Sequence, residues 1–241
     1  MVQALQRTVV RGPTFIRLLA RLTDVAPSPP SQSLPDRLGQ WLDWTQAIAL
    51  STALDGKTST PDPDLPISDN VEENDCARLR ATLVRAIADV PELADAGQSS
   101  GERARAGEAE ANAQVDYALF RQRYVELQRK MLVATGSLRG RLRDRLAQGS
   151  GDMPRLAAVD AAMELALSAR EQKLLSAVPA LLGEHFERLR TDERKAPDDT
   201  GPATGAWLDV FRRDMRNVLL AELDVRFQPV EGLLAALRPA N

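Results

Sequence analysis

The side chains that most often carry chemistry are scarce in this sequence, which contains one cysteine, Cys76, and one histidine, His185. A zinc site needs about four ligands, mostly cysteine and histidine. A di-iron centre in a helical bundle needs a histidine on each of two helices. Neither site can be built within one such chain, and a single cysteine allows no intrachain disulfide. A carboxylate site for Mg²⁺ or Ca²⁺ stays open, but no EF-hand loop is present. We therefore expect no cofactor and no metal.

One segment matches a catalytic motif by its letters alone. Gly97-Gln98-Ser99-Ser100-Gly101 fits G-x-S-x-G, the nucleophile elbow of serine hydrolases. That motif works where a buried strand leads into the turn and a helix follows. Here it lies in a polar stretch with no strand before it, so we interpret the match as coincidence.

Carboxylates offer the remaining route to catalysis, because two well-placed acids suffice for general acid–base work. Asp160 and Glu164 stand one helical turn apart, but such pairs are common on solvated helix faces. The sequence also has no phosphate-binding or dinucleotide-binding motif. We predict that the protein is not an enzyme, with a carboxylate-based site on a helical bundle as the alternative.

Charge is distributed unevenly along the chain. Asp55–Asp75 holds seven acidic residues and one lysine, whereas Arg121–Arg145 holds eight basic residues and two acidic ones. We favour mutual neutralisation within the fold; the alternative is a basic docking face for an acidic partner or a nucleic acid. The alternate arginines from Arg139 to Arg145 lie about 200° apart on a helix, so they form no phosphate-tracking stripe. Nucleic-acid binding is therefore not expected.

Helices must position all of these residues. Much of the apolar content is alanine and leucine, and no alternating strand pattern stands out. We predict an all-α protein, a helical bundle in which long amphipathic, coiled-coil-like helices alternate with disordered linkers. Its predicted parts are an N-terminal helical region (1–90), a flexible linker (91–112) and a C-terminal long-helix bundle (113–241). Apolar spacing predicts helices over 14–24, 33–49, 69–90, 117–146, 152–189 and 207–237.

The two longest apolar patterns are heptad seams. The first repeats from Tyr117 to Leu138 and the second from Leu220 to Leu237. Pro229 falls inside the second, so either the helix kinks there or a new helix starts with Pro229 in its first turn; the unbroken phase favours continuity. Such seams need a partner helix, so we predict a homo-oligomer or a complex with a coiled-coil protein. The candidate interaction surface comprises Tyr117, Phe120, Tyr124, Leu127, Met131, Arg139, Arg143, Leu220, Leu223, Phe227 and Leu234.

Smaller features carry further predictions. Trp41 and Trp44 stand at i, i+3 on the second helix and are expected to anchor the core; the alternative is an exposed binding surface. Pro179 is expected to kink the fifth helix. His185 and Cys76 fall on apolar stripes and are expected to be buried, the histidine with a hydrogen-bond partner.

The first predicted helix, which contains Phe15–Leu22, is expected to pack on the rest of the protein. As a short basic amphipathic helix it could instead lie on a membrane surface. No apolar run approaches the roughly 20 residues that span a bilayer, and the N-terminal residues lack the apolar region of a secretory signal. The expected location is the cytoplasm, with peripheral contact to the inner membrane as an option.

Several stretches resemble a proteobacterial family that is known only as a domain of unknown function. They are Arg11–Asp24, Leu38–Leu54, Gly136–Arg143, Leu156–Arg190 and Trp207–Arg238. The resemblance covers nearly the whole chain and brings no activity or catalytic residue. Because members of that family tend to be encoded beside cell-envelope proteins, the resemblance implies a helical interaction or scaffold protein that serves a bacterial envelope assembly from the cytoplasm.

Overall fold

The computed structural model describes residues 14–24, 32–56, 71–94, 115–195 and 206–238. Within these ranges every regular element is a helix, which confirms the predicted all-α bundle. The elements are α1 (Thr14–Thr23), α2 (Leu34–Trp41), α3 (Trp44–Leu54), α4 (Val71–Ala88), the 3-10 helix η1 (Pro91–Leu93), α6 (Tyr117–Ala147), α7 (Met153–Leu175), α8 (Val178–Lys195) and α9 (Ala206–Leu237).

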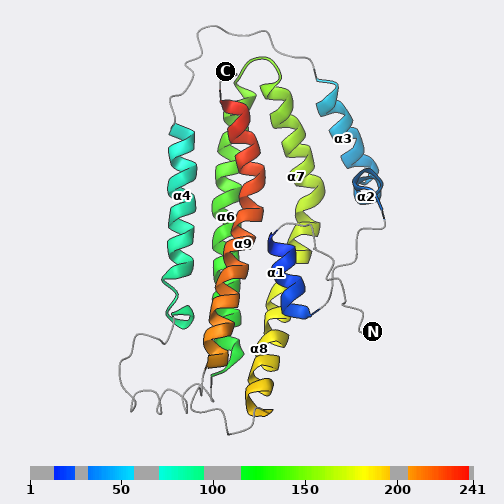
Figure 1. The fold of residues 1–241 in the computed structure, drawn as a ribbon. Helices are drawn as coiled ribbons and strands as arrows, with labels where there is room; N and C mark the ends of the chain where they lie inside the picture. Colours follow the sequence, from blue (N-terminus) through cyan, green and yellow to red (C-terminus); the bar gives the residue numbers. More distant parts are fainter. Residues whose placement is uncertain (1–13, 25–31, 57–70, 95–114, 196–205, 239–241) are drawn as a thin grey trace, which may run out of the picture.

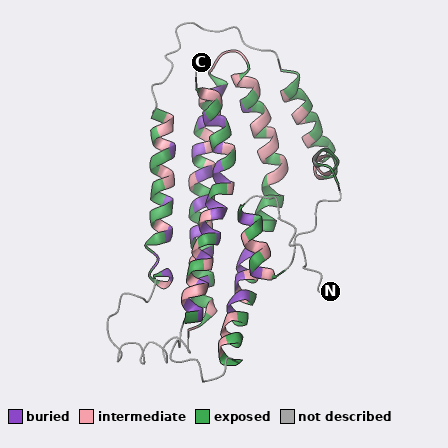
Figure 2. Ribbon diagram, in the orientation of Figure 1, coloured by how far each residue is buried: buried purple, intermediate pink, exposed green. Residues whose placement is uncertain are grey.

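Helix α9 is the centre of the bundle. It packs against α1, α4, α6, α7, α8 and η1, and fourteen of its residues are buried. Figure 1 shows α9 running alongside α6, with α4 on one side and α7 on the other. Helix α3 lies outermost, against α7. Figure 2 shows the same gradient, with buried residues concentrated on α6 and α9 and none on α3.

Five of the ten aromatic residues gather at one end of the bundle, where α6, α8 and α9 meet. The ring of Phe211 lies 5.1 Å from Phe120 and 5.0 Å from Phe186, both edge-on. Trp207 packs edge-on against Phe186 at 5.0 Å. Edge-to-face pairs at these separations are favourable beyond their buried area, so this cluster anchors the three helices to one another.

Two predicted helices are each divided in two. Asp43 caps α3, since its side chain accepts a hydrogen bond from the Gln46 backbone N–H and the Gln46 side chain accepts one from the Asp43 N–H. This capping box begins a new helix where one continuous helix was predicted. Similarly, the predicted kink at Pro179 is a break, because α7 ends at Leu175 and Pro179 lies in the first turn of α8, where proline is tolerated. Pro229, in contrast, lies inside the continuous helix α9.

The predicted flexible linker is wrong at its start. Pro91–Leu93 form η1, and Leu93 is fully buried against the bundle. Arg216 of α9 donates a hydrogen bond to the Leu93 carbonyl oxygen, and Arg212 donates one to that of Glu92. The rest of the predicted linker that follows Ala94, including the Gly97–Gly101 motif, lies outside the described residues.

Helices from the predicted N-terminal region share the core with those from the C-terminal region. Phe15 and Leu22 of α1 are buried, as are Leu83 and Ile87 of α4. Helix α1 packs on α8 and α9, which agrees with the prediction that its apolar side faces the protein. Among the described helices none is both long enough and apolar enough to cross a membrane.

Candidate functional site: a polar seam and two exposed apolar faces

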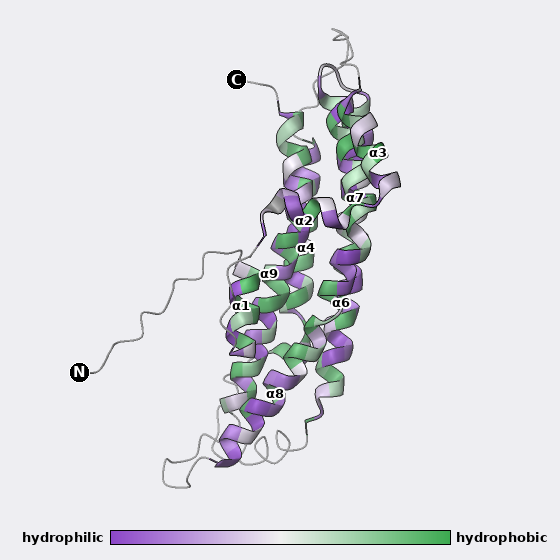
Figure 3. Cartoon of the chain, turned by 90° about the vertical axis from the view of Figure 1, so that its right-hand side faces the viewer, coloured by the Kyte–Doolittle hydropathy of each residue, from purple (hydrophilic) through white to green (hydrophobic). Residues whose placement is uncertain are grey.

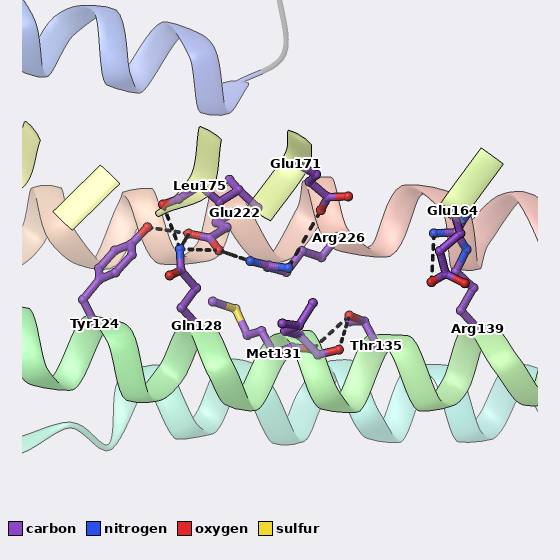
Figure 4. A network of polar contacts seen from close by, with 11 residues as sticks. Tyr124, Gln128, Met131, Thr135, Arg139, Glu164, Glu171, Leu175, Glu222 and Arg226 are labelled. Carbon is purple, nitrogen blue, oxygen red and sulfur yellow. Dashed lines mark hydrogen bonds and ion pairs between the residues drawn. The ribbon is translucent and has the colours of Figure 1, made fainter. Parts of the chain in front are cut away.

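A buried carboxylate stands at the middle of the bundle. Glu222 of α9 is 0% exposed, yet its oxygens have four donors (Figure 4). Tyr124 Oη donates to Oε2 at 2.6 Å, and Gln128 Nε2 lies 3.1 and 3.2 Å from the two oxygens. Arg226 Nε and Nη2 donate to Oε1 at 3.0 and 2.7 Å. A buried charge is costly unless it is paired and hydrogen-bonded, and Glu222 is both.

The same network reaches α7. Gln128 Nε2 also donates to the carbonyl oxygen of Leu175, at the end of α7, at 3.0 Å. On its other side Arg226 lies 3.8 Å from Glu171. The network therefore joins α6, α7 and α9 at the point where α7 gives way to α8.

A second ionic cluster lies further along α6 and α7. Arg139 donates to both oxygens of Asp160, at 2.9 and 2.7 Å, and lies 3.4 Å from Glu164. Arg143 pairs with Glu164 and lies 3.6 Å from Asp160. The Arg139 and Asp160 side chains are only 15% and 12% exposed. We call these residues together with the Glu222 network the polar seam.

Burial raises the pKa of both tyrosines of α6, of which Tyr124 belongs to this seam. It raises the pKa of Tyr124 well above 10, and the neighbouring Glu222 carboxylate adds to the effect. Burial also raises the pKa of Tyr117 to about 12. For Arg139, burial opposes the charged form, but the hydrogen bond and charge of Asp160 outweigh it and raise the pKa. Both tyrosines are therefore neutral donors at neutral pH, and Arg139 keeps its charge.

A histidine–carboxylate pair also lies in the described part of the bundle. His185 Nε2 lies 2.9 Å from Asp214 Oδ2, the histidine–carboxylate half of a catalytic triad. A triad also needs a nucleophile within hydrogen-bond reach, and in the described part of the chain no serine, threonine or cysteine side chain bonds to His185. The described residues likewise contain no group of three or more metal-binding side chains. Two solvent-open hollows of 270 and 580 Å³ border α4, and the polar seam opens into neither.

Helix α7 is polar on its inner side and apolar on its outer side. Its acids Asp160, Glu164 and Glu171 face arginines of α6 and α9. Only Ala157 and Leu175 of its 23 residues are buried. Leu165 on the outer side exposes 68% of its surface, and Leu174 on a flank of the helix exposes 67%. Charge pairing therefore holds much of this helix in place. Figure 3 shows hydrophobic colour on α3 and, mixed with hydrophilic colour, on α7.

Two exposed faces are built from apolar side chains. The first, the α3 face, consists of Trp44, Ile48 and Leu54, which are 81%, 48% and 46% exposed. No residue of Trp44–Leu54 is charged, although 27% of the chain is. The second, the α6–α7 face, consists of Val125 and Leu132 of α6 and Ala161, Leu165 and Ala169 of α7, all of them exposed.

The predicted interaction surface is wrong, since nearly all of its apolar residues lie in the core. Tyr117 and Leu220 are partly buried, and the others are buried: Phe120, Tyr124, Leu127, Met131, Leu223, Phe227 and Leu234. The physical reason is that α6 and α9 pack along each other, so each seam finds its partner helix within the chain.

The predicted basic docking face is also wrong at Arg139 and Arg143, because both arginines are paired with Asp160 and Glu164. The predicted neutralisation does occur within the fold, but the acids come mainly from α7. From the acidic stretch, the described contact to this arginine-rich region is Glu72 with Arg145, at 3.5 Å.

Of the remaining single-residue predictions, some are confirmed and others are wrong. Cys76 and His185 are buried as predicted, and the histidine has its partner Asp214. The predicted core role of the tryptophans is wrong. Trp44 is 81% exposed, and Trp41 is half-buried with the Arg170 guanidinium 4.7 Å from its ring centroid.

Sequence reasoning missed Glu222, Gln128 and Arg226. Glu222 and Arg226 stand one turn apart, and such pairs usually lie on solvated faces. A usable signal was the apolar content of α9 around them, because Val218, Leu219, Ala221 and Leu223 point to different sides of the helix. A helix that is apolar all round is buried all round, and so are the charges within it.

Comparison with known proteins yields one match. The family described as "Protein of unknown function (DUF3348)" has a model that matches residues 1–239. No curated protein and no solved structure matches the chain.

Proposed function

From the premise that this chain belongs to the DUF3348 family, we propose that it is a non-enzymatic helical interaction protein that binds a partner protein through the α3 face. The observation that carries the proposal is the exposure of Trp44 on a helix without charge. Tryptophan is enriched among the residues that dominate binding energy at protein interfaces.

Covering the exposed apolar surface of Trp44 is favourable in free energy. A tryptophan side chain presents about 200 Å², so covering the exposed part of Trp44 is worth on the order of 4 kcal/mol. Ile48 lies one turn further along and adds to the same patch. The opposite side of α3 already packs on α7, so the remaining side is available to an apolar pocket of the partner.

The non-enzymatic part of the proposal is supported by how the polar groups are used. The buried acids of the polar seam hold helices together, and each described one has an arginine or tyrosine partner. As to cellular role, we propose that the partner belongs to a bacterial cell-envelope assembly and that the chain binds it from the cytoplasm. This step is supported by the family resemblance alone.

Site-specific photo-crosslinking in the native host tests the proposal. A photoreactive phenylalanine analogue at position 44 is expected to give a discrete crosslinked protein in living cells. The matched control is position 84, since Val84 is an exposed apolar residue on α4, far from α3 (38% exposed). The proposal is overturned if position 44 yields no more crosslinked product than position 84.

Substitution of Trp44 gives the second readout. Trp44→Asp is expected to leave the fold intact, because the side chain makes no buried contact, while abolishing recovery of the crosslinked protein by affinity capture. An intact complex with Trp44→Asp would place the interface elsewhere.

A further inference from the structure

The α6–α7 face is a second unpartnered surface, and its position follows from helix geometry. Leu132 stands seven residues before Arg139, so it lies on the side of α6 that faces α7, yet 44% of it is exposed. On α7, Leu165 lies about 100° round the helix from the inward Glu164. Leu174 lies about 80° the other way, on the side where Glu171 meets Arg226 of α9. Leu165 and Leu132 thus lie on the same side of the α6–α7 pair, away from α9.

Small residues on both helices leave space along the α6–α7 face. Gly136 and Gly140 follow Leu132 at intervals of one turn, and a Cβ added at either would meet nothing within 4 Å. On the α7 side Ala161 and Ala169 stand one turn before and after Leu165, and both are exposed. An approaching helix could therefore come close to both backbones, with Leu165 as the projecting contact.

The charge beside this face is mainly positive. Arg121 and Arg129 stand one turn before and after Val125. Both side chains are exposed, and neither makes an ion pair with a described residue. Glu126 pairs with Arg123, the acids of α7 face inward, and the exposed Asp144 lies nineteen residues beyond Val125. The face therefore carries positive charge at its Val125 end.

We propose that the α6–α7 face binds an amphipathic helix of a partner protein that carries an apolar stripe and acidic residues beside it. Apolar contact with Leu132 and Leu165 supplies the seat, as in other complexes where a helix lies in a groove. Arg121 and Arg129 select acidic flanks and set the orientation of the bound helix, because complementary charge gives specificity. This surface is separate from the α3 face, so a protein with both would join two partners.

Fluorescence anisotropy with two synthetic peptides tests the proposal. Each probe is a labelled helix of about 20 residues, long enough to follow α7 for most of its length, with leucines on one face. One probe has glutamate flanks, and its twin has lysine flanks. The acidic probe is expected to bind the full chain at least tenfold more tightly than its twin. Raising the salt concentration should reduce the difference.

Two aspartate variants form a matched pair, since Leu165 and Leu174 are almost equally exposed on the same helix. Leu165→Asp is expected to weaken binding of the acidic probe at least tenfold, and Leu174→Asp to leave it within twofold. Arg121→Glu combined with Arg129→Glu should reverse the preference towards the lysine probe. Circular dichroism and urea unfolding verify that each variant is folded.

Several outcomes would overturn this proposal. They are equal loss in Leu165→Asp and Leu174→Asp, no binding of either probe, and a dimer in native mass spectrometry that Leu165→Asp dissociates, which would make a second copy the occupant. Binding to vesicles of phosphatidylserine and phosphatidylcholine that Leu165→Asp abolishes, without binding of the acidic probe, would make the occupant a membrane. None of these results bears on crosslinking at Trp44, so the two proposals fail separately.

Discussion

Removal of the Glu222 carboxylate tests whether the polar seam stabilises the bundle. In Glu222→Met, Arg226 would keep only Glu171 at 3.8 Å, and its side chain is 5% exposed. Tyr124 would lose its acceptor, and Gln128 would keep only the Leu175 carbonyl oxygen. Breaking a buried pair from one side costs about 3–5 kcal/mol. We expect a loss of that size in the free energy of unfolding.

The double variant distinguishes the cost of an unpaired charge from the loss of favourable contacts. Glu222→Met with Arg226→Met removes both charges and keeps similar volume, and such replacements are often neutral. It should recover at least half of the single variant's loss. Urea unfolding followed by circular dichroism measures both, and at a slope of roughly 3 kcal/mol per molar urea the single variant's midpoint should fall by at least about 1 M.

Arg80→Met is the control for an exposed pair. Arg80 contacts Asp224 and Glu231 at the surface with 39% of its side chain exposed, so its loss should stay within about 1 kcal/mol. The stabilising role of the polar seam is contradicted if Glu222→Met lowers the free energy of unfolding no more than Arg80→Met does. The cost of an unpaired charge is contradicted if the double variant is as unstable as the single one.

Three further predictions follow from packing, protonation and burial. Gly183→Ala should destabilise the protein by about 1–3 kcal/mol, because the added Cβ would lie 2.8 Å from the Tyr117 ring; Gly136→Ala, in open space, should stabilise it by up to about 1 kcal/mol, and parallel thermal melts compare the two. Because the folded pKa of Tyr117 is about 12 against an ordinary value of 10, the unfolded chain loses this proton first, so the free energy of unfolding should fall as pH rises from 10 towards 12; urea titrations of Tyr117→Phe should show a smaller fall. In hydrogen exchange by mass spectrometry, amides of α7, which buries two residues, should exchange sooner than those of α9, which buries fourteen; equal protection would contradict the view of α7 as a charge-held helix.

The helices themselves were predictable because apolar spacing reports helical faces directly. The seams from Tyr117 and Leu220 correspond to α6 and α9, and the unbroken phase across Pro229 gave the correct continuity. The same spacing could not say where the partner helix lies. A heptad seam looks identical whether its partner belongs to the same chain or to another, and the long-range packing of α6 on α9 decides it.

The candidate site was less predictable, because burial of a charge depends on neighbours that are distant in sequence. Asp160 and Glu164 resemble a solvated pair until α6 places Arg139 opposite them. The prediction for Trp44 was wrong in the opposite way, because it placed an exposed side chain in the core. Its type favours a core position, but the capping box at Asp43 starts a separate helix whose contact side excludes Trp44.

The position of α9 along the chain has a consequence for how the protein folds. The helix on which α1, α4, α6 and α8 all pack follows every one of them in sequence. During translation those helices are made before their common partner exists, and their apolar faces stay uncovered until α9 is synthesised. Contacts such as those of α1 with α9 close very long loops, and high contact order slows folding. We therefore expect slower folding than for helical bundles of local topology, and a dependence on chaperones while the nascent chain still lacks α9.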